Sequence, residues 1–404
     1  MKYVLRPLRP LGVGFQLVFA FCVILLSLGL GAVWFMEHRG HIVTGMSNQV
    51  VWGLPHVFAV FLVVAASGAL NMASMASVFG KTEFKPLAPL SGVLAIALLM
   101  GGLMVLMLDL GRPDRLIIAM THMNFKSIFA LNIFLYSGFV GFVAAYLWTM
   151  MERRMNRFTP LAGLLAFLWR LALTTGTGSI FGFLVARQAY DSALLAPLFI
   201  ALSLSYGLAV FLGVLMLACQ AGQRPLGDGL VARLARLQVI FIAAGFYFVL
   251  VYHLTNMYFT KHHDFERFIL LDGGVYTALF WLGQVVLGCV VPLILLLHPN
   301  IGAMRRRVAA SAGLVVLGGL AQMYVTIIGG QAFGLVLFPG YQVSSSFYDG
   351  VTATYTATMP EWLLGLGGVA AAALLVMVAL RIMGFLPERL DDESAPLHTP
   401  PLVA

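Results

Sequence analysis

Long apolar runs alternate with short polar connections along the whole chain, and the lengths of the runs give the first prediction. A helix of about 20 residues, rising 1.5 Å per residue, spans the ~30 Å hydrocarbon layer of a bilayer. Ten runs are long enough, at about 13–35, 52–78, 87–110, 128–150, 161–185, 193–219, 239–258, 276–297, 308–328 and 362–383. The sequence therefore predicts an all-α, polytopic membrane protein with ten transmembrane helices.

The composition supports this class. Hydrophobic residues make up 61% of the chain and charged residues 10%, and the mean hydropathy is +0.94. A soluble domain of this length needs more charge on its surface, so a soluble protein is excluded. The net charge of +8 is not taken as a nucleic-acid signal, because its meaning depends on which connections carry it. The first run is longer than the apolar core of a signal peptide, about 7–15 residues, which predicts a retained first helix.

Lysine and arginine are concentrated on one set of alternate connections. That set holds Lys2, Arg6, Arg9, Lys81, Lys85, Arg153, Arg154, Arg157, Arg224, Arg233, Arg236, Arg305, Arg306, Arg307, Arg381 and Arg389. The opposite set holds Arg39, Arg112, Arg115, Lys126, Arg187, Lys261 and Arg267. Because positively charged connections stay in the cytoplasm, we expect a multi-pass protein of the bacterial inner membrane with both termini cytoplasmic. The longer connections, 37–51, 111–126, 260–274 and 330–361, then lie on the periplasmic side, and the last suits a lid or a partner-docking surface.

A weak internal repeat predicts how the helices are grouped. Residues 71–106 and 181–217 share an apolar run, a proline, a second apolar run and a glycine near its middle. We therefore expect two four-helix bundles with peripheral first and last helices. The predicted divisions are 1–50 (first helix and outer loop), 51–190 and 191–330 (the two bundles), 331–386 (outer loop and tenth helix) and 387–404 (disordered cytoplasmic tail).

Ionisable residues gather near the outer ends of the predicted helices. His56 lies about one turn into the second helix, Asp109 ends the third, Arg187 ends the fifth, and His253 lies about five residues before the seventh ends. An ionisable residue at this depth is costly unless it is held, so it is a site hypothesis by default. Structural polar residues would have no reason to choose one leaflet. The alternatives are hydrated helix ends and a histidine bonded to a neighbouring carbonyl.

This set of side chains suits a quinone. A carboxylate, an imidazole and a guanidinium in a partly apolar cleft can exchange protons with the oxygens of a ligand. We therefore expect His56 and Asp109 to be the acid–base residues, with Arg112, Arg187 and His253 as further quinone-binding residues. Axial ligation of haem b by His56 and His253 is less fitting, because membrane cytochromes usually place paired histidines deeper and often use two pairs.

Arg170 lies near the middle of the fifth helix and must face the bundle interior or water. With Thr175 and Asn71 it could form a proton path from the cytoplasm, or it could be a buried structural bridge. The sequence His262-His263-Asp264-x-Glu266 resembles a metal cluster, but a hydrated loop is the favoured interpretation. The three cysteines are far apart without a Cys-x-x-Cys pair, which predicts no iron–sulfur or zinc site.

Three motifs resemble one known family. Leu-Asp-Leu-Gly-Arg-Pro (108–113), Ala-Arg-Gln-Ala-Tyr (186–190) and Trp-Gly-Leu-Pro-His-Val-Phe (52–58) are similar to the signatures of the NrfD/polysulfide-reductase (PsrC-like) membrane subunits. The resemblance covers about 50–340. The ten-span form resembles the branch found in alternative complex III, in high-molecular-weight-cytochrome complexes and in sulfite-reductase-linked (DsrMKJOP) complexes, with the DsrP-like subunit the nearest.

The resemblance implies a subunit of a quinone-linked oxidoreductase, with no haem or iron–sulfur cofactor of its own. It would bind menaquinone or ubiquinone, dock a periplasmic ferredoxin-like iron–sulfur subunit, and assemble with cytochromes and a heterodisulfide-reductase-like protein. His56 and Asp109 carry over by position as quinone-site residues. The chain has Gly53 and Thr175 where some members have Asn and Tyr, which leaves Arg187, Arg112 or His253 as the second partner of the quinone. Proton translocation would be an added function, and a secondary transporter with a midplane site is the alternative.

Overall fold

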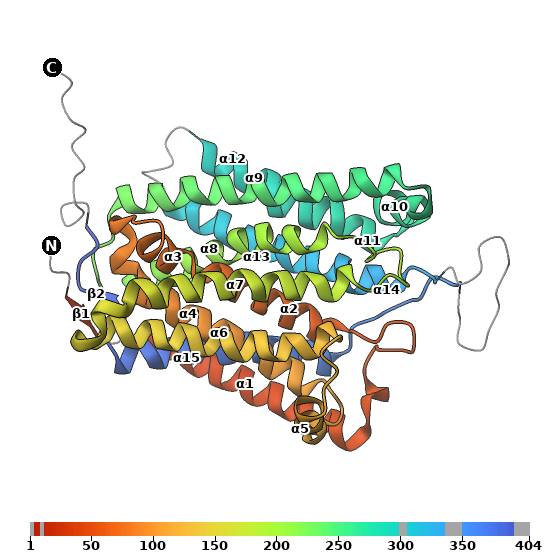
Figure 1. Ribbon diagram of the computed structural model, residues 1–404, viewed down its shortest axis with the longest axis horizontal. Coiled ribbons are helices and arrows are strands. Elements are labelled where there is room, and N and C mark those ends of the chain that lie inside the picture. Colours follow the sequence, from red (N-terminus) through yellow and green to blue (C-terminus); the bar gives the residue numbers. More distant parts are fainter. Residues whose placement is uncertain (1–3, 9–11, 299–304, 336–349, 392–404) are drawn as a thin grey trace.

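The computed structural model describes residues 4–8, 12–298, 305–335 and 350–391. Within these ranges, ten helices are long and apolar enough to cross a membrane, and they lie side by side along one axis (Figure 1). The predicted all-α polytopic membrane fold is thus confirmed, and each predicted run falls on one of these helices.

The first five spans contain several local breaks. They are α1 (Val13–Arg39), α2 (Leu54–Ala69) continued by α3 (Asn71–Ser77), η2 (Thr82–Leu87) continued by α4 (Ala88–Leu108), α6 (Ile128–Met151), and η4 (Arg153–Phe158) continued by α7 (Thr159–Gly182). Short elements between them are β1 (Leu5–Arg6), η1 (His41–Val43), η3 (Pro113–Arg115) and α5 (Leu116–Thr121).

The last five spans include two π-helical segments. They are α8 (Leu195–Ala221), α9 (Asp228–Tyr258), α11 (Val275–Ala278) with the π-helix η7 (Leu279–Val290) and α12 (Val291–Leu297), α13 (Arg305–Tyr324) with the π-helix η9 (Val325–Gly329) and α14 (Gly330–Ala332), and α15 (Met359–Ile382). Their connections hold η5 (Thr260–His262), α10 (His263–Arg267) and η6 (Phe268–Asp272), and β2 (Leu386–Pro387) follows α15.

α9 starts well before the predicted boundary at residue 239. Arg233 and Arg236 lower the hydropathy of its first turns, so the continuous apolar run begins later in the sequence than the helix does. Leu230 and Leu234 are nevertheless buried on one face of these turns. This end of α9 is an amphipathic extension of the membrane-crossing helix, which a search for continuous apolar runs does not find.

α2 lies at the centre of the molecule, and almost all of its residues are buried. It packs against α4, α8 and α15. A Cβ atom at Gly207 of α8 would overlap the backbone of Gly68 of α2, so the two helices meet backbone to backbone. This contact is the close approach of small residues that drives helix association in lipid.

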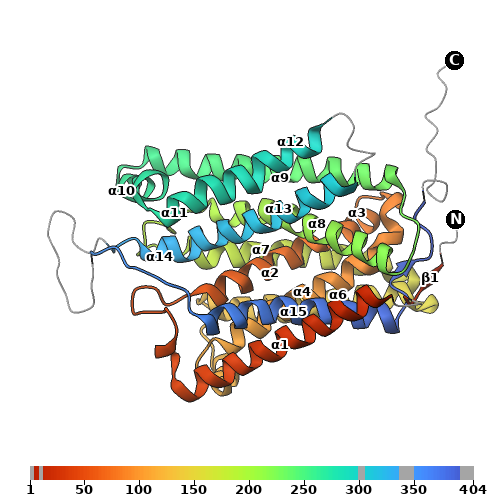
Figure 2. The ribbon, with the colours of Figure 1, turned by 180° about the vertical axis from the view of Figure 1, so that it is seen from behind.

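The first and last spans pack against each other on one side of the molecule. α1 lies against α15, which also contacts α4, and Figures 1 and 2 both show α1 and α15 along the edge opposite α9 and α12. The grouping of the remaining helices into two four-helix bundles stays a prediction.

The two ends of the described chain meet. β1 pairs with β2, and Arg224 donates hydrogen bonds to the carbonyl oxygens of Arg6, Pro7, Leu386 and Pro387. The first part of the segment expected to be disordered, 387–391, is therefore packed, and the rest of it, 392–404, lies outside the described residues. Residues 336–349 of the long outer connection also lie outside them.

Candidate functional site

His56 and Asp109 lie together at the end of the molecule opposite the two strands. His56 is in the first turn of α2, where Pro55 starts the helix, and Asp109 caps the end of α4. α4 stops here because Gly111 adopts a left-handed conformation, with φ of +69°, and Pro113 follows. His56 Nδ1 and Asp109 Oδ2 are 2.9 Å apart. The packing of α2 against α4 thus places the two predicted acid–base residues in contact.

The Asp109 carboxylate is buried without a good hydrogen-bond donor. Its side chain has no exposed surface, while the His56 side chain is 18% exposed. The imidazole is near enough for a hydrogen bond, but the angle is outside hydrogen-bond geometry, and among the described residues no other donor reaches either oxygen. The burial excludes a hydrated helix end for Asp109. A buried acceptor left unsatisfied in this way costs about 1–3 kcal/mol, which a ligand hydroxyl or a water molecule would offset.

An aromatic wall stands beside this pair. The Trp52 ring stacks over His56 at a centroid distance of 6.2 Å and an interplanar angle of 27°. Trp52 also contacts Phe129, Phe181 and Tyr190, at 6.0, 5.8 and 6.5 Å. Phe129 is 45% exposed, so the wall reaches the outside of the helix bundle. A flat ring can pack against such a surface, and His56 would face its polar edge.

Arg187 supports the site from one side. Its guanidinium donates to the carbonyl oxygens of Gln49 and Gln331, both at 2.9 Å, and partial burial lowers its pKa. The Gln331 side chain accepts from the amides of Val51 and Trp52, at 2.9 and 3.0 Å, and donates to the Trp52 carbonyl. Arg187 was expected to bind a quinone directly. Its observed contacts hold the segment that leads into α2, and direct binding of a quinone by Arg187 stays a prediction.

Glu361 supports the same segment from the other side. This carboxylate is fully buried in the first turn of α15 and accepts from the Tyr355 hydroxyl at 2.7 Å and from the Gly45 amide at 2.9 Å. The Tyr355 hydroxyl in turn accepts from the Leu54 amide at 2.7 Å. Burial, together with the adjacent carboxylate, raises the pKa of Tyr355 well above its ordinary value, so it stays protonated. Sequence reasoning missed Glu361, although Thr358 and Glu361 form a recognisable capping box.

Arg112 lies on the exposed surface at this end of the molecule. Its guanidinium pairs with Asp114 at 3.1 Å, and both side chains are more than half exposed. This hydrogen bond raises the pKa of Arg112 and lowers that of Asp114. Since Arg112 is engaged with Asp114, the structure does not bring it to Asp109.

Arg170 of α7 forms a buried bridge to α2 and α3. It donates to the Asn71 side chain at 2.5 Å and to the Ser67 carbonyl at 3.1 Å. Thr174, rather than Thr175, joins this cluster, through a 2.6 Å hydrogen bond to the Ser67 hydroxyl. Thr175 is exposed, because adjacent helix positions point about 100° apart. Of the three residues expected to form a proton path, Arg170 and Asn71 are therefore in contact and Thr175 is not with them.

His253 has a partner of its own. Its Nδ1 lies 2.7 Å from Oε2 of Glu266, and Asn256 donates to Oε1 of Glu266 at 2.8 Å. The interpretation of the 262–266 segment as a hydrated loop is wrong for His262 and Glu266, which are both buried. His253 therefore belongs to a second histidine–carboxylate pair, and no described contact joins it to His56.

Comparison with known proteins places most of the chain in one family. Residues 42–335 match the model for "Polysulphide reductase, NrfD". The Hdr-like menaquinol oxidoreductase integral membrane subunit of Archaeoglobus fulgidus is 29% identical, over 86% of this chain and 88% of its own length. The putative dimethyl sulfoxide reductase membrane subunit of Halobacterium salinarum is 30% identical, over 94% of this chain and 93% of its own. A polysulfide reductase chain of Wolinella succinogenes is 26% identical, over 71% and 96%.

Proposed function

The chain belongs to the polysulphide reductase NrfD family, and we propose that it is the quinone-binding membrane subunit of an electron-transfer complex. Its role is to hold a quinone or quinol at the end of the molecule where His56 and Asp109 lie. Electrons are exchanged there with an iron–sulfur protein docked at that end. The relative from Archaeoglobus fulgidus is a menaquinol oxidoreductase subunit by name, which favours menaquinol over ubiquinol as the ligand.

The observation that carries the proposal is the contact between His56 and the unsatisfied, buried carboxylate of Asp109. His56 Nδ1 faces Asp109, so Nε2 is the ring nitrogen left to meet a ligand oxygen. The Trp52 ring and its aromatic neighbours supply an apolar surface beside His56. The residues present therefore fit a quinone ring with its polar edge turned toward His56.

The chemistry requires the pair to move protons while electrons leave by another route. Oxidation of a quinol to a quinone releases two electrons and two protons. His56 accepts the two protons of the ligand hydroxyls one after the other and passes each of them to water, through Asp109 or directly, while the two electrons pass to the partner iron–sulfur protein. In the reverse direction the pair donates protons instead. General acid–base catalysis of this kind contributes about 10²–10⁴-fold to a rate.

The distribution of Lys and Arg favours the periplasm of a bacterial inner membrane as the location of the His56 end. The partner is then a periplasmic ferredoxin-like iron–sulfur subunit. Cytochromes and a heterodisulfide-reductase-like protein complete the complex, as expected for a DsrP-like subunit. Oxidation of quinol at this site releases its protons on the outer side.

The test is turnover of the assembled complex with a menaquinol analogue and an artificial electron acceptor. His56→Ala and Asp109→Asn should each lower the rate at least ~100-fold, because the first removes the proton acceptor and the second removes the carboxylate beside it. Co-purification of the partner subunits should be unchanged. Arg112→Ala is the matched control at the same end of the molecule, since its exposed side chain pairs with Asp114 rather than with the site. Unchanged turnover in both site variants would remove the proposal.

A further inference from the structure

The second histidine–carboxylate pair lies near the outer end of α9. His253 comes from α9 and Glu266 from α10, with side chains 13% and 3% exposed. In the described part of the chain no Lys or Arg pairs with Glu266, since Lys261 pairs with Asp191 and Arg267 with Asp272. The described side-chain partners of the Glu266 carboxylate are therefore an imidazole and an amide, neither of which carries a fixed charge.

The other titratable groups near this pair have their own contacts. Tyr252 donates its hydroxyl to the Ala189 carbonyl at 2.6 Å, and Tyr276 stacks on Tyr324. Burial lowers the pKa of His262, which favours its neutral form. The pair is therefore the place on these elements where a mobile proton can be held.

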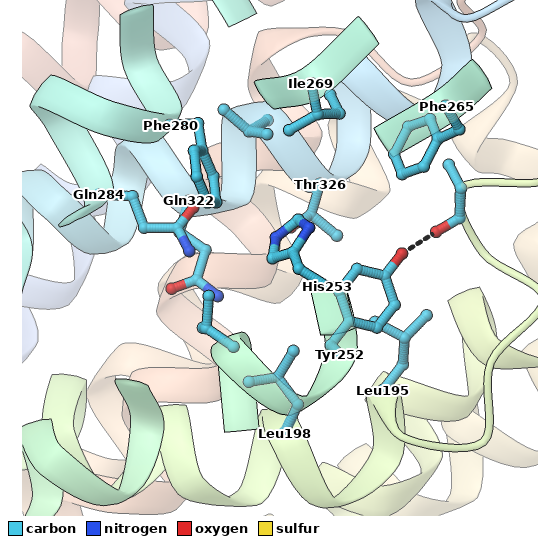
Figure 3. A pocket seen from close by; sticks show the side chains of 13 residues that line it. Leu195, Leu198, Tyr252, His253, Phe265, Ile269, Phe280, Gln284, Gln322 and Thr326 are labelled. Atoms are coloured by element: carbon cyan, nitrogen blue, oxygen red, sulfur yellow. Dashed lines mark hydrogen bonds between the residues drawn. The ribbon is translucent and has the colours of Figure 1, made fainter. Parts of the chain in front are cut away.

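A narrow cavity opens beside His253. Its volume is about 30 Å³, roughly enough for one water molecule. Figure 3 shows His253, Gln284 and Gln322 around it, with Tyr252 and Thr326 also in its wall. Gln284 and Gln322 are buried and offer both donors and acceptors. A water molecule in this position would have the two to four polar partners that buried water needs.

A second cavity continues from the first toward the middle of the molecule. Its volume is about 20 Å³, it shares Gln284 and Gln322 with the first cavity, and it adds Ser205 and Tyr206. The Tyr206 hydroxyl donates to Gln322 at 2.6 Å, and Gln238 donates to the Ser205 hydroxyl at 3.1 Å. Polar groups thus follow one another from His253 to Gln238.

The series of polar residues from His253 to Gln238 extends over a large part of the membrane thickness. Gln238 and His253 both lie on α9, and their separation of 253 − 238 = 15 residues corresponds to a rise of about 22 Å. That is roughly three quarters of the hydrocarbon layer. Three π-helical segments contribute to the wall of the first cavity: η6 through Ile269, η7 through Gln284, and η9 through Val325 and Thr326. Wide turns of this kind occur frequently at functional sites.

We propose that His253 and Glu266 form a second proton-binding site, separate from His56 and Asp109. Water molecules in the two cavities carry protons between this site and the middle of the membrane, along Gln284, Gln322 and Tyr206. The step moves a proton and nothing else: the pair takes up H⁺ from one water and returns it to another, with no oxidation or reduction. The buried polar cluster around Arg170 differs from this arrangement, because Arg170 donates a hydrogen bond directly to Asn71.

Infrared spectroscopy of the purified full-length chain in lipid nanodiscs tests the site without any quinone. A pH step should give a protonated-carboxyl band that is absent in Glu266→Gln and retained in Asp109→Asn. The band should shift in D₂O within the mixing time. Gln284→Leu and Gln322→Leu keep Glu266 but should slow that exchange roughly tenfold or more, because a bridging water loses a polar partner. A band unchanged in Glu266→Gln, or no exchange over hours in the natural chain, overturns the proposal.

Turnover of the complex then separates the two sites. Glu266→Gln should keep electron transfer within about twofold, while Asp109→Asn loses it by ~100-fold. If both variants lose it equally, Glu266 belongs to the first site and the second site is overturned. If the natural complex shows no quinone-linked electron transfer, the proposed function fails, and the infrared result still decides on the second site.

Discussion

The two histidine–carboxylate pairs use the same ring nitrogen and similar distances, but their carboxylates are held differently. Asp109 lies 2.9 Å from His56, and no described residue offers it a well-oriented donor. Glu266 lies 2.7 Å from His253 and also accepts a hydrogen bond from Asn256. The first pair therefore has acceptor capacity left for a ligand, whereas both carboxylate oxygens of the second pair are already engaged.

The surroundings of the two pairs also differ. His56 lies beside the Trp52 wall, which reaches the outside of the bundle through Phe129. His253 faces a water-sized cavity lined by Gln284 and Gln322. The first pair thus adjoins an aromatic surface that reaches the outside, and the second adjoins a space of about the size of a water molecule. The predictions below test this difference, beginning with the largest expected effect.

The largest effect should come from changing each carboxylate to its amide. Asp109→Asn should lower quinol-linked turnover by about 10²–10⁴-fold, because the imidazole loses its charged partner at the reacting end. Glu266→Gln should change turnover by about twofold or less. Steady-state rates of the purified complexes measure both, and the comparison fails if the two variants have the same rate.

Removing the extra donor of the second pair should cost stability. Asn256→Ala leaves Oε1 of Glu266 buried without its hydrogen bond, and we expect a loss of about 1–3 kcal/mol in the free energy of unfolding. Chemical denaturation in mild detergent measures it. Gln16→Ala, at an exposed position of α1, is the control. A loss no larger than that of the control would show that the Asn256 contact is not needed to bury Glu266.

Loosening the support of α2 should affect the first pair and leave the second unchanged. Tyr355→Phe removes the hydroxyl that accepts from the Leu54 amide and donates to Glu361. Displacement of the first turn of α2 should lower turnover by about tenfold, since small misplacements of reacting groups are costly. The infrared band of Glu266 should not change. A change in that band with normal turnover would reverse the assignment.

The smallest effect concerns pH. Burial lowers the pKa of His262, with the carboxylates of Asp191 and Glu266 opposing the shift. The stability gained from its burial is therefore complete above the ordinary pKa of histidine, and it is lost as the pH falls through the lowered pKa of the folded state. His262→Gln should reduce the drop in melting temperature between pH 8 and pH 5 by a few degrees at most. Scanning calorimetry at both pH values measures the change, and an unaltered drop would contradict it.

The spans and the first pair could be predicted because their signals are local. Apolar length alone marks a span, and Asp109 sits where an apolar run meets Gly111 and Pro113. The sequence places His56 and Asp109 at the same depth in the membrane, which predicts that the two side chains lie near each other. The depth of a residue does not show on which side of the helix its side chain lies. The sequence therefore predicts Thr175 beside Arg170, whereas Thr174 is the residue that joins the cluster of Arg170 and Ser67.

The remaining parts of the site depend on contacts between distant segments. Gln331 meets Val51 across 280 positions of the sequence, and Glu361 meets Gly45 across 316. Such partners follow from tertiary packing rather than from a motif. The sequence does not predict the burial of Glu266 for a second reason. The short connection that contains it is rich in charged residues, and Glu266 is buried only because α10 packs against α9.

The meeting of Gly68 with Gly207 has a mechanical consequence. A carrier that exposes its cargo first to one compartment and then to the other must let its halves tilt or slide along a common seam. Here the main chains of α2 and α8 touch at that seam, so tilting would open an empty gap in the centre of the protein. The Gly68–Gly207 contact thus disfavours an alternating movement of α2 against α8 and favours a mode of action in which these helices keep their positions.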